Sequence, residues 1–320
     1  MEFETQLKGL FDDRFKTQEP LAKHLNFRIG GPAAWFAEVK SVEELQESLR
    51  LATEAGVKTF VLGGGSNTLA SDEGFDGLVL KMAMRNFTIK GTAVIAEAGV
   101  ISAALARATA EAGLAGFTWA ISLPGTIGGG VRGNAGCFGG EMKDVITKVD
   151  VLRDGEVVTI HKEDLGFGYR ESHFKRHSDI VVRVYLSLTP GDKETLVAEL
   201  KDKVTARKES QPLYAGSAGC IFKNYEIASP EELERLKTVL NIPESMQQSM
   251  RLSAGWLIDR ADLKGKQVGD AKISEEHGNF LINLGNATAS DIVMLISEVK
   301  TEIRDLYGIQ LQEEVQYVGF

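Results

Sequence analysis

Residues 121–140 read ISLPGTIGGGVRGNAGCFGG, and eight of these twenty residues are glycine. A glycine costs about 1 kcal/mol in a helix interior relative to alanine, so this density predicts a loop with at most a short helix. Gly128, Gly130 and Gly133 formally match the dinucleotide fingerprint G-x-G-x-x-G. We reject a Rossmann interpretation, because Pro124-Gly125 stands where a strand should lead in and no clear amphipathic helix follows Gly133.

A second glycine-rich segment, Gly63-Gly64-Gly65-Ser66-Asn67, follows an apolar, β-branched stretch that predicts a strand at 57–62. Successive glycines let backbone amides approach an anion closely, and Ser66 and Asn67 add side-chain donors. A tight turn is the alternative. Neither segment has the Gly-Lys-Ser/Thr ending of a P-loop. Two glycine-rich loops outside a Rossmann pattern suit a large cofactor, such as FAD, that is cradled between two small subdomains.

Length and composition narrow the class of protein. A chain of 320 residues predicts two or three domains. The net charge of -9 argues against a nucleic-acid surface, and two cysteines are too few for a disulfide framework. The start, MEFETQLKGLFDDRF, does not resemble a signal peptide, and no apolar stretch is long enough to span a bilayer. We therefore expect a cytoplasmic protein without nucleic-acid or membrane partners, and favour a monomer.

The order of local signals predicts an α+β fold. Ser41 and Glu44 form a capping-box pattern that opens the first expected helix. We expect helices at 41–55, 101–112, 193–208, 230–240, 252–260 and 289–306. We expect strands at 57–62, 78–81, across 87–97, and at 145–153, 156–160, 179–188 and 309–318. The last of these strands is predicted to return to an earlier domain.

Three residues that are remote in sequence carry groups able to manage charge on a reacting carbonyl-type group. Arg170 stays protonated and can grip a carboxylate with two hydrogen bonds, although a structural ion pair is the alternative. Cys220 carries a thiol that is mostly protonated at neutral pH yet acidic enough to donate, although buried cysteines are commonly inert. Glu314 would assist only if it is protonated or paired with Arg170.

Strand alternation should point Glu314 and Glu313 to opposite faces, one toward the site and the other toward solvent.

We assign Cys137, inside the glycine loop, to packing. His173 and His177 are spaced i, i+4, but no H-E-x-x-H motif accompanies them, so HFKRH is interpreted as a solvated basic patch and no metal site is expected. Asp72, with Glu73 and Asp76, lacks the pattern of a calcium loop and is assigned to a turn.

Several short motifs together resemble the UDP-N-acetylenolpyruvoylglucosamine reductase family. They are NFRIGGP at 26–32, LGGGSN at 62–67, SDEGFDGLV at 71–79, LPGTIGGGVRGNAG at 123–136, YRES at 169–172, SAGCIFKN at 217–224, AGWLID at 254–259 and EEVQYVG at 313–319. Each motif is modest alone, but their order and spacing over nearly the whole chain are specific. Many members carry serine at Cys220 and proline at Tyr225. The tyrosine-bearing insertion of one branch is absent between Ser172 and Lys208.

The resemblance implies a two-part FAD-binding domain of the vanillyl-alcohol-oxidase (PCMH) type plus a separate α+β substrate domain. The implied FAD-binding domain spans 20–190, with subdomains of about 20–84 and 85–190. A connector at 191–210, a substrate-binding domain at 211–307 and a C-terminal strand at 308–320 that returns to the active site would follow.

The resemblance also implies an activity: NADPH-dependent reduction of UDP-N-acetylglucosamine enolpyruvate to UDP-N-acetylmuramate through bound FAD. Its catalytic positions fall on Arg170, Cys220 and Glu314. Its cofactor-binding positions fall on Gly63, Gly64, Gly65, Ser66, Asn67, Pro124, Gly125, Thr126, Gly128, Gly129, Asn134 and Ala135, and its substrate-binding positions on Tyr169, Lys223 and Asn224. The alternatives are an FAD-linked alcohol oxidase on the same scaffold and a non-catalytic nucleotide-sugar-binding protein.

Overall fold

The computed structural model describes residues 2–320, which form two compact units. The first unit contains the chain up to Pro20, Pro32–Gly65 and Phe75–Glu209. The second contains Leu21–Gly31, Ser66–Gly74 and Ser210–Phe320. Each unit has its own apolar core. None of the helices in residues 2–320 is both long and apolar enough to cross a membrane.

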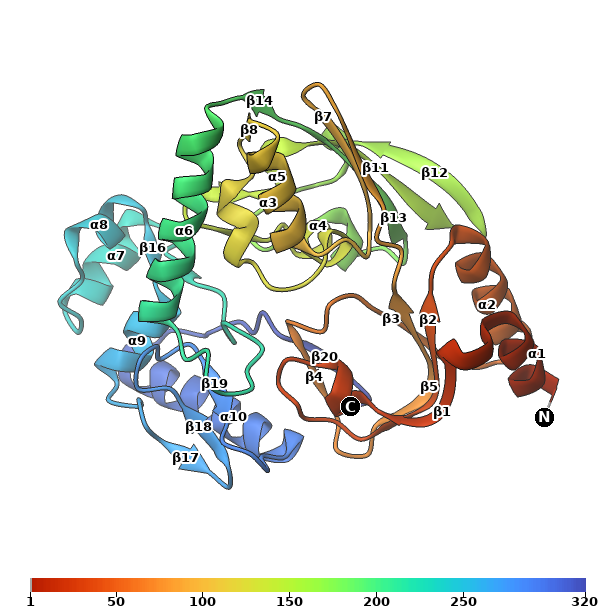
Figure 1. Cartoon of the computed structure of the whole chain (residues 1–320). Coiled ribbons are helices and arrows are strands. Elements are labelled where there is room, and N and C mark those ends of the chain that lie inside the picture. The colour runs from red at the N-terminus through yellow and green to blue at the C-terminus, as the bar shows by residue number, and fades with distance from the viewer. Residues whose placement is uncertain (1) are drawn as a thin grey trace. The chain divides into compact units, whose positions relative to one another are not determined.

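The first unit contains a four-stranded sheet of order β1-β2-β5-β3, drawn in Figure 1. Its strands are β1 (Phe15–Pro20), β2 (Pro32–Val39), β5 (Phe75–Met82) and β3 (Thr59–Leu62). β1 pairs antiparallel with β2, whereas β2 and β3 both pair parallel with β5. The helices of this region are α1 (Glu2–Phe11) and α2 (Val42–Glu54).

A five-stranded antiparallel sheet of order β12-β11-β13-β7-β6 completes the first unit. Its strands are β12 (Glu156–His161), β11 (Ile146–Arg153), β13 (Ile180–Ser187), β7 (Ala93–Glu97) and β6 (Phe87–Lys90). The accompanying helices are α3 (Ser102–Glu111), α4 (Ile127–Gly133), α5 (Met142–Val145) and α6 (Lys193–Ser210). Two short pairs are β8 (Leu114–Ala115) with β14 (Thr189–Pro190), and β9 (Gly136–Cys137) with β10 (Gly140–Glu141).

The second unit is built around the long helix α10 (Ala289–Tyr307), which buries apolar residues at helical spacing, among them Ile292, Leu295 and Val299. Its other helices are α7 (Pro230–Lys237), α8 (Glu244–Gln248) and α9 (Ala254–Arg260). Its strands are β4 (Thr68–Ala70), β15 (Tyr225–Glu226), β16 (Arg251–Leu252), β17 (Gln267–Val268), β18 (Ala271–Ile273), β19 (Leu281–Asn283) and β20 (Gln316–Val318). β20 pairs parallel with β4, and Figure 1 shows the two strands side by side.

Five 3₁₀ turns complete the secondary structure of residues 2–320. They are η1 (Asp12–Arg14), η2 (Leu21–His24), η3 (Thr118–Ser122), η4 (Lys162–Asp164) and η5 (His173–Lys175).

Most predicted elements are confirmed, with three differences. Ser41 caps α2 as predicted, but the carboxylate of Glu44 binds the Lys40 N–H and Arg14, so the capping box is only half formed. The strand predicted at 57–62 is the shorter β3, in which only Leu62 is buried. The C-terminal strand predicted at 309–318 shrinks to β20, because the preceding residues bond to the segment around Ile221 instead.

Candidate active site

The two glycine-rich loops touch through their backbones within the first unit. A Cβ atom added at Gly64 would lie 2.5 Å from the Cα of Gly125 and 3.2 Å from the N of Thr126. One added at Gly63 would lie 2.8 Å from the Thr126 Oγ1. Side chains cannot be accommodated at such separations, so the glycines allow the loops to approach each other directly.

Glycines inside the second loop have a different role. The loop contains α4, the short helix that the glycine density allows. A Cβ at Gly128 would lie 2.8 Å from that of Ala98, and one at Gly130 would lie 2.8 Å from the Cε of Met142. Close packing of α4 therefore accounts for these two glycines without any ligand. Gly129 and Gly133 have no comparable steric conflict.

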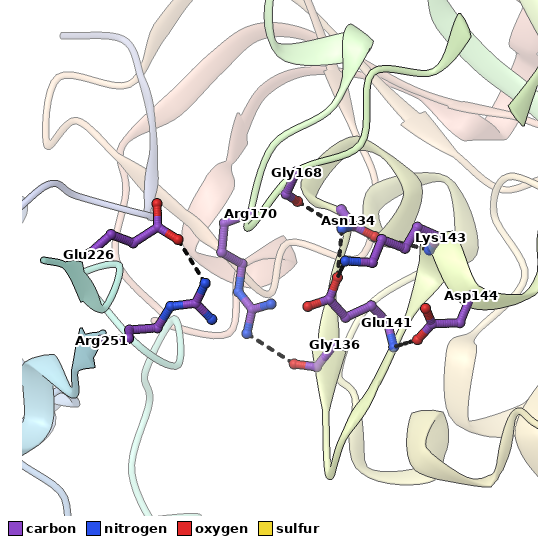
Figure 2. Close-up of polar contacts among 9 residues, drawn as sticks. All are labelled: Asn134, Gly136, Glu141, Lys143, Asp144, Gly168, Arg170, Glu226 and Arg251. Atoms are coloured by element: carbon purple, nitrogen blue, oxygen red, sulfur yellow. Dashed lines mark hydrogen bonds and ion pairs between the residues drawn. The ribbon is translucent and has the colours of Figure 1, made fainter. Parts of the chain in front are cut away.

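Asn134 ends α4 in the left-handed conformation, with φ of 40°. Figure 2 shows its side chain in contact with Glu141, Lys143 and Gly168. Nδ2 donates to the Gly168 O at 2.8 Å and to Glu141 at 2.9 Å, while Oδ1 accepts from the Lys143 N–H at 3.0 Å. The buried amide thus ties the glycine loop to the segment that carries Arg170.

Arg170 combines a half-buried side chain with an unusual backbone. Its φ is 54°, a conformation that non-glycine residues rarely adopt and that concentrates at functional sites. Its guanidinium donates to the Gly136 O at 3.0 Å (Figure 2), and its own carbonyl accepts from Lys175 Nζ at 2.6 Å. The guanidinium carbon lies 5.2 Å from the centre of the Tyr169 ring. These contacts hold the side chain in one orientation.

The HFKRH segment is exposed only at Arg176 and His177, which corrects in part the sequence-based interpretation of a solvated patch. His173 Nε2 lies 2.6 Å from the carboxylate of Asp179, and its ring stacks on that of His177 at 4.0 Å. Arg153 contacts the same carboxylate at 2.6 Å, and these hydrogen bonds, that from Arg153 above all, lower the pKa of Asp179 to about 2. These contacts hold the residues that follow Tyr169 against Arg153 and Asp179. Among residues 2–320, no group of three or more His, Cys, Asp or Glu side chains could hold a metal ion.

Cys220 and Glu314 are neighbours within the second unit. The Glu314 N–H donates to the carbonyl of Ile221, the residue after Cys220, at 2.7 Å. The Glu314 carbonyl accepts from Asn67 Nδ2 at 3.1 Å. Both Cys220 and Glu314 are half-buried. The structure therefore brings together two of the three predicted catalytic residues, while Arg170 belongs to the first unit.

Strand alternation predicted that the glutamate directed away from the site would face solvent, but Glu313 is only partly exposed. Its carboxylate is half-buried and accepts from Lys300 Nζ at 2.7 Å and from the Tyr317 hydroxyl at 2.5 Å. Burial alone would raise its pKa, but these hydrogen bonds lower the pKa of Glu313 overall. The lowered pKa keeps the Glu313 carboxylate ionised at neutral pH, and its two hydrogen bonds hold this residue in place beside Glu314.

The predicted substrate-binding residues Lys223 and Asn224 lie just beyond Cys220. The Lys223 N–H donates to the Gln312 carbonyl at 2.8 Å, and Asn224 Oδ1 accepts from the Ala254 N–H at the start of α9 at 3.1 Å. Tyr225, where many relatives were expected to carry proline, donates to Glu232 at 2.7 Å. These bonds fix the backbone of the segment.

Sequence reasoning missed two residues that shape this unit. Asn279 bonds the main chain next to Cys220, and Asp72, predicted only as a turn residue, binds the first N–H groups of α10, whose N-cap is Thr288. The carboxylate of Asp72 accepts from the Ala289 and Ser290 N–H groups at 2.7 and 3.0 Å. No local pattern marks either contact.

Comparison with known proteins identifies the family. Residues 211–318 match the model described as UDP-N-acetylenolpyruvoylglucosamine reductase, C-terminal domain, and residues 33–161 match an FAD binding domain. The UDP-N-acetylenolpyruvoylglucosamine reductase 2 of Symbiobacterium thermophilum is 36% identical over 98% of this chain and 96% of its own. The reductase of Desulfosudis oleivorans is 37% identical over 99% and 98%.

The chain belongs to the UDP-N-acetylenolpyruvoylglucosamine reductase family. The crystal structure of the reductase from Thermus caldophilus is similar to this chain with a TM-score of 0.75 and 36% identity, over 95% of this chain and 98% of that one. The α+β fold with an FAD-binding domain of the PCMH type and a separate C-terminal domain is therefore confirmed. As a member of this reductase family, the chain is a flavin-dependent oxidoreductase with FAD as its cofactor.

Proposed function

We propose that this chain reduces the enolpyruvyl group of UDP-N-acetylglucosamine enolpyruvate to give UDP-N-acetylmuramate, with NADPH as the source of hydride. When bound, FAD supplies the hydride-transfer chemistry that connects the two substrates. The observation that carries the proposal is the backbone bond between Glu314 and Ile221, which brings the main chain of Glu314 next to the segment that carries Cys220. We further propose that the enzyme acts as a monomer in the cytoplasm, in peptidoglycan precursor synthesis and hence in cell shape and division.

The residues of the glycine-rich loops fit FAD in two ways. At Gly64 and Gly125 the loops meet main chain to main chain with no side chain between them, and glycine-rich backbone of this kind can bind a pyrophosphate. Within the described chain, the buried Thr126 Oγ1 and Asn67 Oδ1 have no hydrogen-bond partner. Buried polar groups are normally paired, so each of these two atoms is open to a ligand. We propose that the loops at 63–67 and 124–135 hold the cofactor.

Arg170 is proposed to bind the carboxylate of the enolpyruvyl group. Reduction of the double bond builds negative charge on the carbon beside this carboxylate, and a fixed guanidinium is well suited to stabilise that charge. The contacts of Arg170 with Gly136 and Tyr169 hold the guanidinium before the substrate arrives. Tyr169, Lys223 and Asn224 are proposed to contact the same substrate.

Cys220 is proposed to donate the proton that completes the reduction. A thiol is a stronger acid than the serine hydroxyl expected in many relatives. Glu314 contributes as a protonated acid or as a partner of Arg170, because an isolated carboxylate would repel the developing charge. The anchoring of Glu313 by Lys300 and Tyr317 holds the backbone of Glu314 in place for either role.

The overall activity is tested anaerobically with the yellow FAD-loaded protein. NADPH should bleach the flavin absorbance, and the enolpyruvyl sugar nucleotide should restore it. Rapid restoration by oxygen together with an alcohol substrate would identify an oxidase. A colourless protein that binds a UDP-sugar without turnover would identify a sensor. Either result would refute the proposed function.

The assignment of Cys220 is tested by single-turnover oxidation of the reduced flavin. Cys220→Ser should keep substantial activity, because a hydroxyl can still deliver a proton. Cys220→Ala should lose roughly 10²–10⁴-fold in rate, the usual contribution of a general acid. An alanine variant as fast as the parent would show that the proton comes from elsewhere.

A further inference from the structure

We propose that Asn279 is a positioning residue for Cys220, an inference that rests on the proposed role of Cys220 as proton donor. Asn279 lies in the loop before β19 and is 3% exposed. Its side-chain amide bonds both main-chain polar groups of Phe222, two residues after the cysteine. No general acid–base role is assigned to Asn279 itself.

The clamp consists of three hydrogen bonds. Asn279 Oδ1 accepts from the Phe222 N–H at 2.9 Å, and Nδ2 donates to the Phe222 carbonyl at 2.8 Å. The Asn279 carbonyl accepts from the Ile221 N–H at 2.9 Å. Phe280, the next residue, forms an isolated antiparallel bridge with Cys220. The loop therefore holds the two peptide N–H groups that follow the cysteine.

On the N-terminal side of Cys220, the backbone is a glycine, which restricts the conformation of the cysteine little. Gly219 has φ of 78°, a conformation accessible mainly to glycine, and its N–H bonds the Ser217 hydroxyl at 3.2 Å. The direction of the thiol thus depends on the clamped side. Because the Ile221 carbonyl also accepts from the Glu314 N–H, the clamp fixes Cys220 and Glu314 against each other.

Among side chains of its size, only asparagine can both accept from the Phe222 N–H and donate to the Phe222 carbonyl. Phe222 is 1% exposed, so water cannot replace a lost partner for its N–H or its carbonyl. Aspartate keeps the acceptor but sets a second oxygen against the Phe222 carbonyl, and alanine removes both partners. A shift of about 1 Å in a reacting group can cost about 10²-fold in rate, so loss of the clamp should slow proton transfer.

The variants are Asn279→Asp and Asn279→Ala, with Asn283→Asp as the matched control. Asn283 is also buried, and its Nδ2 donates to the Phe27 carbonyl at 3.0 Å, away from the Phe222 main chain. The control therefore introduces the same chemical change in the same unit. Folding of each variant is verified by its thermal transition.

The first readout is the rate at which iodoacetamide alkylates each cysteine of the FAD-loaded protein. The modified cysteines are identified by peptide mapping after digestion. We expect the rate at Cys220 to rise at least about fivefold in the Asn279 variants, because local opening exposes a half-buried thiol. Cys137, in the first unit, is the internal control and should react at its parental rate. An unchanged or slower rate at Cys220 would overturn the positioning role, whatever the activity.

The second readout is a double-mutant cycle on the single-turnover rate. Asn279→Asp should lower the rate about tenfold or more when Cys220 is present, and less than about twofold in the Cys220→Ala background. Equal losses in both backgrounds would indicate a merely structural role and overturn the proposal. If alkylation changes but Cys220→Ala is fully active, the positioning stands and the proton-donor assignment falls.

A measurement on the parent protein covers the case in which neither variant folds. The clamp predicts that the Phe222 amide exchanges with deuterium among the slowest in its unit. Exchange as fast as that of exposed loop amides would refute the clamp.

Discussion

The closest backbone contact between the glycine loops predicts a large effect of one methyl group. In Gly64→Ala the new Cβ would lie 2.5 Å from the Gly125 Cα and 3.1 Å from its carbonyl carbon. Carbon atoms prefer separations of about 3.5–4.0 Å, so the loops must move apart by about 1 Å. Both partners are main chain, so no change of rotamer can relieve the overlap.

The magnitude follows from the cost of overpacking. Extra methyl groups in well-packed regions typically cost about 1–3 kcal/mol. The apoprotein can relieve this strain by opening the loops, whereas FAD binding requires them to close again. At about 1.4 kcal/mol for each tenfold change, Gly64→Ala should bind FAD roughly 5- to 150-fold more weakly.

The assay is a titration of the apoprotein with FAD, in which quenching of the flavin fluorescence measures binding. Gly133→Ala is the matched control, because a Cβ there meets no heavy atom within 4 Å and lies at the end of α4. It should bind FAD within about twofold of the parent and gain up to about 1 kcal/mol in stability. FAD affinity of Gly64→Ala equal to that of the parent would refute the reasoning.

Two further predictions concern stability. Because the pKa of Asp179 is lowered from 3.8 to about 2, its ionised form stabilises the fold above about pH 4, and this stabilisation is lost as pH falls toward 2. Asp179→Asn should therefore cost about 1–2 kcal/mol at pH 7 and much less near pH 2.5, measured by urea unfolding; a pH-independent difference would contradict this. Asp72→Ala should cost about 1–2 kcal/mol, because the Ala289 and Ser290 N–H groups lose their acceptor while the Thr288–Asp291 capping box of α10 remains. The exposed Asp76→Ala is the control, and an equal effect of both would exclude capping.

The parts of the fold that depend on local signals were predicted from the sequence. Ser41 caps α2, the hairpin of β6 and β7 falls within 87–97, and α6 and α10 begin at the expected residues. Capping residues, glycines and periodic apolar positions act over a few residues, so they can be recognised without tertiary information. The family motifs indicated Arg170, Cys220 and Glu314 as candidates for catalysis, and the structure bonds Glu314 to Ile221, the residue after Cys220.

The contacts that could not be predicted connect distant residues through a side chain and a main-chain group. Asn279 reaches Phe222 over 57 positions, Asp72 reaches Ala289 over 217, and Asn67 reaches Glu314 over 247. Such bonds leave no periodic signal in the sequence. Glu313 shows the same limit, because alternation indicates which face it occupies but not that Lys300 stands there to pair with it.

The pairing of β20 with β4 has a consequence for how the protein is made. The second unit includes Leu21–Gly31 and Ser66–Gly74, which leave the ribosome early, yet β4 gains its partner only when Gln316–Val318 has been synthesised. Closing so long a loop is slow. A nascent chain therefore carries β4 with an unpaired edge until residues 316–318 have been synthesised, and the unit that contains the Cys220 thiol cannot be completed before then.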